Sequence, residues 1–178
     1  MPRSAMGASP QSAYQRALGR LARRDHSVTE LRRALEARGH APDEIQSALE
    51  RLRRERYLDD AAFAERFARS RLAHHGHGRA LVRQGLRQRG VSRGETEAGL
   101  AGALREVDEQ AVLDGVARRY WRAHARVEPA RRLPRLWGFL LRRGFAPGLV
   151  RERLSALWPR WADALDGLEP AEPAEEGH

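Results

Sequence analysis

Arginine is the residue type with the most chemistry to offer in this 178-residue chain. Every one of its 33 basic residues is arginine, and the formal net charge is +9. A guanidinium group is permanently charged, and its planar fork of donors matches phosphate and carboxylate groups. Codon usage can explain arginine in place of lysine, but it does not explain the uneven distribution. Positions 66–94 hold eight arginines and positions 129–151 hold six, with no acidic residue in either window.

Three of these arginines form a row. Arg79, Arg83 and Arg87 are spaced by four, so they share one face of a helix, where like charges repel by a few tenths of a kcal/mol per pair. A sequence that tolerates such repulsion favours an anionic partner, either a phosphate backbone or an acidic protein surface. A solvated face is the plainer alternative. The candidate contact residues from the two windows are Arg71, Arg79, Arg83, Arg87, Arg132, Arg135, Arg142 and Arg143.

The sequence lacks the residues needed for disulfide bonds, metal binding or catalysis. The chain has no cysteine, which excludes disulfides and thiolate metal sites, and it has no Gly-rich phosphate loop or His-Glu-x-x-His motif. Three histidines at positions 74, 75 and 77 have no acid or cysteine nearby, so a flexible glycine hinge is the better interpretation. Adjacent carboxylates at Asp59 and Asp60 point in different directions on a helix. The sequence therefore predicts no catalytic residue, no metal ligand and no cofactor.

Two further absences bear on location. No apolar run approaches the ~20 residues that a membrane-spanning helix needs. The first eleven residues have no apolar core of the kind that a secretory signal carries. We therefore expect a cytoplasmic protein without a membrane partner. Separately, we expect the protein to act as a monomer.

An internal repeat must position the arginines. Its pattern is an aliphatic residue, a leucine four positions later and a glycine four positions after that, with further apolar positions six and ten residues beyond the glycine. The three copies are Leu31-Leu35-Gly39 with Ile45 and Leu49, Val82-Leu86-Gly90 with Thr96 and Leu100, and Leu136-Leu140-Gly144 with Val150 and Leu154. Such a signal is typical of a tandem array.

Helix signals divide each copy into three helices. Ser27 with Glu30, and Ser92 with Glu95, have the spacing of capping boxes. Pro134 must lie in the first turn of its helix or bend it. Trp158 and Trp161 are expected to cover the end of the array. We predict an all-α fold, an elongated array that can curve, with a disordered arm (1–12), three-helix repeats (13–56, 57–106 and 107–162) and an acidic disordered tail (163–178).

The stretch from Tyr57 to Arg71 begins the second repeat. A helix start is expected at Asp59 and Asp60, because short carboxylates cap the first N–H groups. The two residues before this cap, Tyr57 and Leu58, can fold back on the first turn as a hydrophobic staple. We expect the next apolar face to be buried; it comprises Phe63, Ala64, Phe67 and Ala68.

This stretch also resembles a known signature. The residues Tyr57-Leu58-Asp59-Asp60-x-x-Phe63-Ala64, followed by Arg71, are similar to the signature of the RecX family of recombination regulators. Residues 27–39 and 140–145 resemble motifs of the family's first and third repeats, and the likeness extends over about residues 13–158. Arg56 is a departure, since many members have glycine before the tyrosine.

The resemblance implies a function that composition could not have named. Members of the family are non-enzymatic modulators that bind the filament of RecA on single-stranded DNA along its groove. They block filament growth or promote its loss, and so restrain ATP hydrolysis, strand exchange and coprotease activity. Two alternatives stay open, namely a helix-turn-helix regulator that prefers a particular duplex, and a helical adaptor that binds neither DNA nor a filament.

Overall fold

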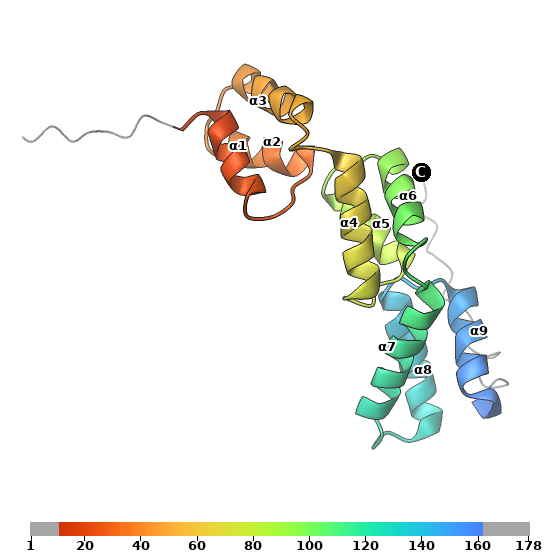
Figure 1. Ribbon diagram of the computed structural model, residues 1–178. Coiled ribbons are helices and arrows are strands. Elements are labelled where there is room, and N and C mark those ends of the chain that lie inside the picture. Colours follow the sequence, from red (N-terminus) through yellow and green to blue (C-terminus); the bar gives the residue numbers. More distant parts are fainter. Residues whose placement is uncertain (1–10, 162–178) are drawn as a thin grey trace, which may run out of the picture. The chain divides into compact units, whose positions relative to one another are not determined.

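The computed structural model describes residues 11–161 of the chain, except for the side chain of Trp161, and consists there of helices without any strand (Figure 1). The all-α prediction is thus confirmed. The predicted acidic tail and most of the predicted arm lie outside these residues. The helices are α1 (Ala13–Leu21), α2 (Val28–Glu36), α3 (Pro42–Arg54), α4 (Asp60–Ala73), α5 (Arg79–Gln88), α6 (Arg93–Ala103), α7 (Glu109–Ala123), α8 (Pro129–Arg142), α9 (Pro147–Leu157) and the 3₁₀ helix η1 (Pro159–Trp161).

Capping explains where several helices begin. The predicted capping boxes of Ser27 with Glu30 and of Ser92 with Glu95 are both present. Sequence inspection missed a third box, in which Ser12 caps α1 together with Gln15, because position 12 was assigned to the arm. Each box satisfies backbone N–H groups that a helix start leaves without a partner.

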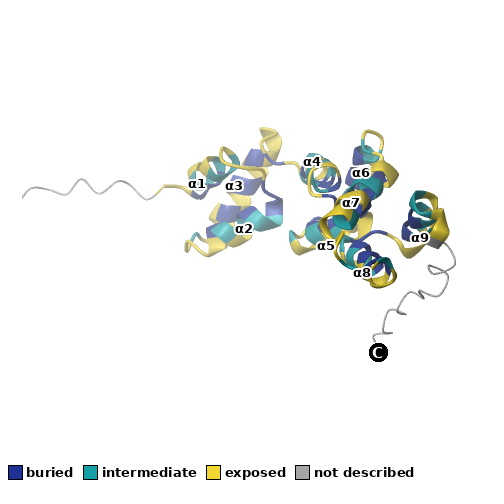
Figure 2. Ribbon diagram, turned by 90° about the horizontal axis from the view of Figure 1, so that it is seen from below, coloured by how far each residue is buried: buried dark blue, intermediate teal, exposed yellow. Residues whose placement is uncertain are grey.

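The repeat pattern marks the interior of the protein. All the apolar repeat positions are buried, and even the polar exception, Thr96, is only 6% exposed. Figure 2 colours the ribbon by burial, and buried and exposed stretches alternate along the helices. The three repeat glycines, Gly39, Gly90 and Gly144, have φ angles of 78°, 72° and 85°. Only glycine adopts this left-handed conformation at little cost, so the pattern encodes the turn after each middle helix.

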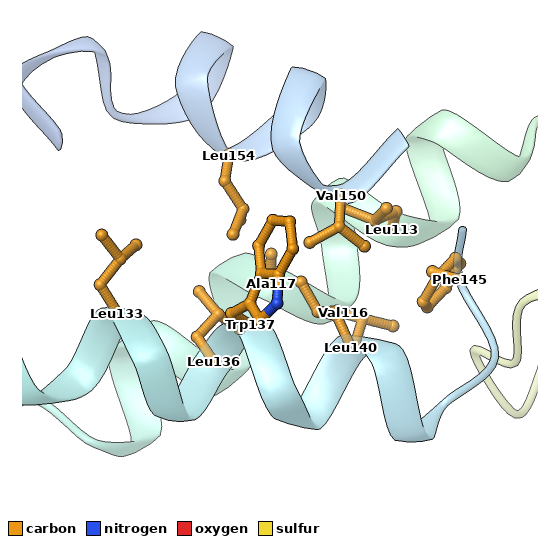
Figure 3. Packing of buried hydrophobic residues seen from close by; sticks show 10 residues of the cluster. All are labelled: Leu113, Val116, Ala117, Leu133, Leu136, Trp137, Leu140, Phe145, Val150 and Leu154. Carbon is orange, nitrogen blue, oxygen red and sulfur yellow. The ribbon is translucent and has the colours of Figure 1, made fainter. Parts of the chain in front are cut away.

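The described residues form two compact units. The first comprises residues 11–65 and 86–99, and the second comprises residues 66–85 and 100–161. In the first unit α1, α2 and α3 pack around leucines and Ile45, and Leu58 joins this core. In the second, α7, α8 and α9 surround Trp137 (Figure 3). At the edge of that core the rings of Trp121 and Trp158 lie 4.7 Å apart, so Trp158 covers the core as expected.

One local prediction needs correction, and another is reduced to one of its two alternatives. Tyr57 is 57% exposed, so the predicted staple is wrong for this residue, and only Leu58 enters the core. Pro134 lies inside α8, so the alternative that places it in the first turn is excluded, and the alternative that it bends the helix stays a prediction. Pro129 takes the first helical position instead, where a missing N–H group leaves no hydrogen bond unmade.

Candidate nucleic-acid interface

The two carboxylates of the signature serve different helices. Asp59 caps its own helix, because its Oδ1 accepts a 3.0 Å hydrogen bond from the N–H of Ala62 in α4. Asp60 Oδ1 instead accepts a 2.9 Å hydrogen bond from the N–H of Val28, the first residue of α2. The cap was predicted, but the second acceptor was expected to serve α4. Asp60 therefore ties the start of the second repeat to a helix of the first.

The apolar part of the signature is a packing surface. Phe63 and Ala64 are buried, as predicted. A Cβ atom at Gly99 in α6 would lie 2.7 Å from the Cβ of Ala64, so small residues at both positions let α4 and α6 meet closely. Phe67 is only half-buried, and the guanidinium of Arg71 lies 5.0 Å from its ring centroid. These residues are structural, and Arg71 has an aromatic partner.

A second acidic residue repeats the role of Asp60. Glu109, the first residue of α7, is 7% exposed and accepts a 3.2 Å hydrogen bond from the N–H of Arg79, the first residue of α5. The same carboxylate accepts a 2.5 Å hydrogen bond from Arg79 Nε. Both acids thus stand at the start of one repeat and satisfy the start of the middle helix of the repeat before it.

The same helix starts also meet helix ends. Ser27 Oγ donates to the carbonyl oxygen of Arg89 over 2.6 Å, and Gly78 N–H donates to that of Arg143 over 2.7 Å. The N–H of Ala80 donates to the carbonyl oxygen of Gly144 over 3.1 Å. The positive end of one helix therefore meets the negative end of another. We call these arrangements the first head-to-tail junction (residues 27–29, 60 and 89–90) and the second head-to-tail junction (residues 78–80, 109 and 143–144).

The histidine-glycine loop at positions 74–78, which was predicted to be a flexible hinge, contributes Gly78 to the second junction. A Cβ atom at Gly78 would lie 2.3 Å from the backbone of Gly144, and one at Gly76 would lie 2.6 Å from a methyl group of Val116. Arg143 Nη1 donates to the carbonyl oxygen of His75 over 2.6 Å. The loop is thus closely packed. Among residues 11–161 no group of side chains is arranged to hold a metal ion.

The structure divides the candidate arginines into two groups. Arg132 is 7% exposed, donates to the carbonyl oxygens of Trp121, Ala125 and Val127, and lies 4.4 Å from the Trp121 ring centroid. It holds the connection between α7 and α8, as Arg143 holds the histidine-glycine loop. With Arg71 and Arg79, these residues have the structural partners described above. Besides Arg79, the exposed candidates are Arg83, Arg87, Arg135 and Arg142.

Helix α8 carries one exposed arginine that was not among the predicted candidates. Arg131 is exposed and precedes Arg135 by four residues, which places both on one face of the helix. The side chain of Arg142 lies back along the helix, since a Cβ atom at Gly138 would be 3.2 Å from its Nη1. The spacing of Arg131, Arg135 and Arg142 by four and seven residues places all three exposed arginines along one face of α8.

A basic cavity in the first unit was missed. It has a volume of about 530 Å³, and five arginines line it: Arg16, Arg20, Arg23, Arg24 and Arg38. We call it the α1 cavity. All five residues lie outside the two windows named above, although positions 1–24, which contain four of them, hold no acidic residue either. The spacing of Arg16, Arg20 and Arg23 by four and three residues was the available signal.

Comparisons with known proteins agree along the chain. Profiles for the first, second and third three-helix domains of RecX match residues 13–52, 59–100 and 107–154. "Regulatory protein RecX" of Halorhodospira halophila is 39% identical over 153 residues, which cover 86% of this chain and 92% of that protein. The protein of the same name from Pseudomonas entomophila is 38% identical, with 85% and 96% coverage.

Solved structures agree in fold. A crystal structure of regulatory protein RecX superposes with a TM-score of 0.73 at 22% identity and covers 80% of this chain and 71% of that chain. RecX from Lactobacillus salivarius gives a TM-score of 0.70 at 17% identity, with 82% and 94% coverage. None of the helices within residues 11–161 has the length and apolar character to span a membrane.

Proposed function

Because the chain belongs to the RecX family of regulatory proteins, we propose that it binds the filament of RecA on single-stranded DNA and inhibits the activities of RecA. The inhibited activities are ATP hydrolysis, strand exchange and coprotease function. The observation that carries the proposal is the match of all three repeats to the corresponding RecX domains over residues 13–154. The protein acts in the cytoplasm as a monomer, and it needs no catalytic centre because occupying the filament is sufficient.

Exposed guanidinium groups supply the contacts in this proposal. Arg83 and Arg87 lie four residues apart on α5, and Arg131, Arg135 and Arg142 lie along one face of α8. Guanidinium groups suit phosphates of the DNA strand and carboxylates of the protein filament equally well. Contacts of this kind fix position without reading a base sequence. They therefore suit a partner that is a long nucleoprotein filament rather than one defined DNA site.

The experiment that tests the proposal is an ATPase assay of RecA on single-stranded DNA with increasing amounts of the protein. We expect the rate of ATP hydrolysis to fall in a dose-dependent way. An unchanged rate, together with tight binding to one particular duplex, would instead indicate a sequence-specific regulator. An unchanged rate without any DNA or filament binding would indicate an adaptor.

A double variant tests the residues. Replacing both Arg83 and Arg87 with alanine should weaken inhibition and, if both contact strand phosphates, reduce the slope of log affinity against log salt by about 1.4. Arg79 is left in place because its removal would strand the buried carboxylate of Glu109. The matched control replaces Arg118 and Arg122, which are exposed on α7 at the same spacing. Equal inhibition by both double variants would remove the α5 row from the interface.

A further inference from the structure

The α1 cavity concentrates positive charge. Arg16 and Arg20 come from α1, Arg23 and Arg24 from the segment after it, and Arg38 from the turn after α2. None of the residues within the described range that line the cavity is acidic. At about 530 Å³ the cavity is of the size that small ligands occupy, since such sites typically measure roughly 300–1,000 Å³.

The protein itself neutralises only part of this charge. Arg24 makes a pair of 3.3 Å hydrogen bonds with Glu30, which lies outside the lining. Arg20 is in the last turn of α1, where the helix dipole favours a cation. Arg16 is only partly exposed, and its buried Nε has no hydrogen-bond acceptor in the described part of the chain. Several guanidinium groups thus face one volume without enough carboxylates, and an anion placed there would relieve their mutual repulsion.

Gly19, which lines the α1 cavity, also indicates that a ligand binds there. Gly19 lies inside α1, where glycine costs about 1 kcal/mol relative to alanine. A Cβ atom at this position would meet nothing within 4 Å, so no internal contact requires the glycine. Its absent side chain keeps the backbone of α1 accessible from the cavity between Arg16 and Arg20. Glycine at such a place is typical of close approach by a ligand.

We propose that the α1 cavity binds phosphate groups of a single nucleic-acid strand. Several guanidinium groups require more than one negative charge, which consecutive phosphates of a strand provide. No Phe, Tyr or Trp is among the described lining residues, and the one ring there, that of His26, is only 5% exposed, so the cavity has no open platform on which a base could stack. The contact is therefore to the backbone and independent of base sequence. It adds a separate site in the first repeat to the arginines of α5 and α8.

The test uses the full chain and a fluorescein-labelled oligo(dT), without RecA, so that its outcome is separate from that of the proposed function. Replacing Arg20 and Arg23 with glutamine should weaken binding and reduce the slope of log affinity against log salt by about 1.4. The matched control replaces Arg53 and Arg54, which are exposed on α3 and lie outside the cavity lining. The control removes the same charge and should leave the slope almost unchanged. Equal slopes for the two double variants overturn the proposal.

A second variant guards against loss of folding. Gly19→Glu improves helix propensity and places a carboxylate three residues from Arg16 and four from Arg23, within reach of both. It should weaken oligo(dT) binding more than Gly19→Gln, while both variants melt at or above the wild-type temperature. Equal binding by Glu and Gln at this position contradicts the proposal.

Inorganic tripolyphosphate, titrated calorimetrically, distinguishes the two sources of phosphate. We expect it to bind wild type, to bind the Arg20/Arg23 variant more weakly and to compete with oligo(dT). If tripolyphosphate binding depends on Arg20 and Arg23 but oligo(dT) binding does not, the ligand is a free oligophosphate and the nucleic-acid assignment is wrong.

Discussion

At the scale of single residues, Arg56 is the clearest case of strain. It has a φ angle of +60°, and it is the one non-glycine residue with positive φ in the described part of the chain. A side chain in this left-handed region costs roughly 1–2 kcal/mol. The resemblance to RecX already indicated the position, since many members carry glycine there.

We therefore predict that Arg56→Gly stabilises the protein by about 1 kcal/mol in chemical denaturation, because glycine adopts positive φ without this cost. Arg54→Gly is the matched control. Arg54 ends α3 in a helical conformation, so glycine there should destabilise the protein. A loss of stability in Arg56→Gly would mean that the arginine side chain makes contacts that outweigh the strain.

Asp60 offers a pH-dependent test of the first head-to-tail junction. Burial raises the pKa of this carboxyl group, although the hydrogen bond from Val28 N–H lowers it. A raised pKa in the folded state means that the folded state binds the proton more tightly than the unfolded state. The contribution of Asp60 to the free energy of unfolding is therefore fully present below the ordinary pKa of 3.8, and it is lost as pH rises through the raised pKa of the folded state.

Asp60→Asn keeps an oxygen acceptor for Val28 and removes the buried charge. We expect this variant to be more stable than wild type at pH 7, and the difference to vanish below the ordinary pKa of 3.8, where Asp60 is neutral. Asp60→Ala removes the acceptor and should be about 1 kcal/mol less stable than Asp60→Asn. Denaturation curves between pH 3 and pH 7 measure both differences. A constant difference between Asn and Asp over this range would show that the charge is not the cause.

The sequence predicted the role of a side chain only where its hydrogen-bond partner lies nearby along the chain. Asp59 acts on Ala62, three residues away, and its role followed from the order of residues alone. Asp60 acts on Val28, 32 residues away, and nothing in the local pattern indicates that partner. The same distance hid the role of Arg143, whose acceptor, the His75 carbonyl, lies 68 residues before it.

At the scale of elements, the three repeat glycines look equivalent in sequence and are not equivalent in space. Beside Gly39 there is open space, since a Cβ atom would meet nothing within 4 Å. At Gly90 a Cβ atom would lie 2.3 Å from Thr29 Oγ1, and at Gly144 it would lie 2.3 Å from the backbone nitrogen of Leu81. The difference arises because the start of a middle helix from the preceding repeat packs on the turns at Gly90 and Gly144. That helix is α2 at Gly90 and α5 at Gly144.

Alanine substitutions should separate these environments. Gly39→Ala should cost only the left-handed conformation, roughly 1–2 kcal/mol. Gly90→Ala should cost more, because the Thr29 side chain must move, and Gly144→Ala should cost most, because backbone must move. Thermal melting of the three variants gives the order directly. Equal costs would mean that the two junctions open without penalty.

Periodicity predicted the helices well, because it reports which face of each helix is apolar. It predicted the buried positions and the turn glycines in all three copies. It could not predict the head-to-tail junctions, which arise only when one copy packs on the next. The two acid-free windows also missed the α1 cavity, although four of its five arginines lie in positions 1–24, which hold no acidic residue. The fifth, Arg38, comes from a turn that the spacing along α1 does not bring near the others.

At the scale of the whole molecule, net charge sets the nonspecific affinity for an anionic partner. The segment from residue 169 to residue 178 contains four glutamates and no arginine, so deleting it raises the formal net charge from +9 to +13. We expect the deletion to increase nonspecific affinity for single-stranded DNA, with a steeper salt dependence. Replacing the four glutamates with glutamine is the matched control for length, and it should have the same effect. Weaker DNA binding by either variant would contradict the prediction.

The two head-to-tail junctions also set an order of events during synthesis. A ribosome releases α2 before it has made Asp60, Arg89 and Gly90. These three residues accept hydrogen bonds from the start of that helix. It releases α5 before it has made Glu109 and the carbonyl groups of Arg143 and Gly144. The start of the middle helix therefore waits for the following repeat, first at α2 and then at α5. A nascent chain that stalls between repeats leaves its newest middle helix with exposed N–H donors, which makes a pause there more hazardous than a pause after residue 144.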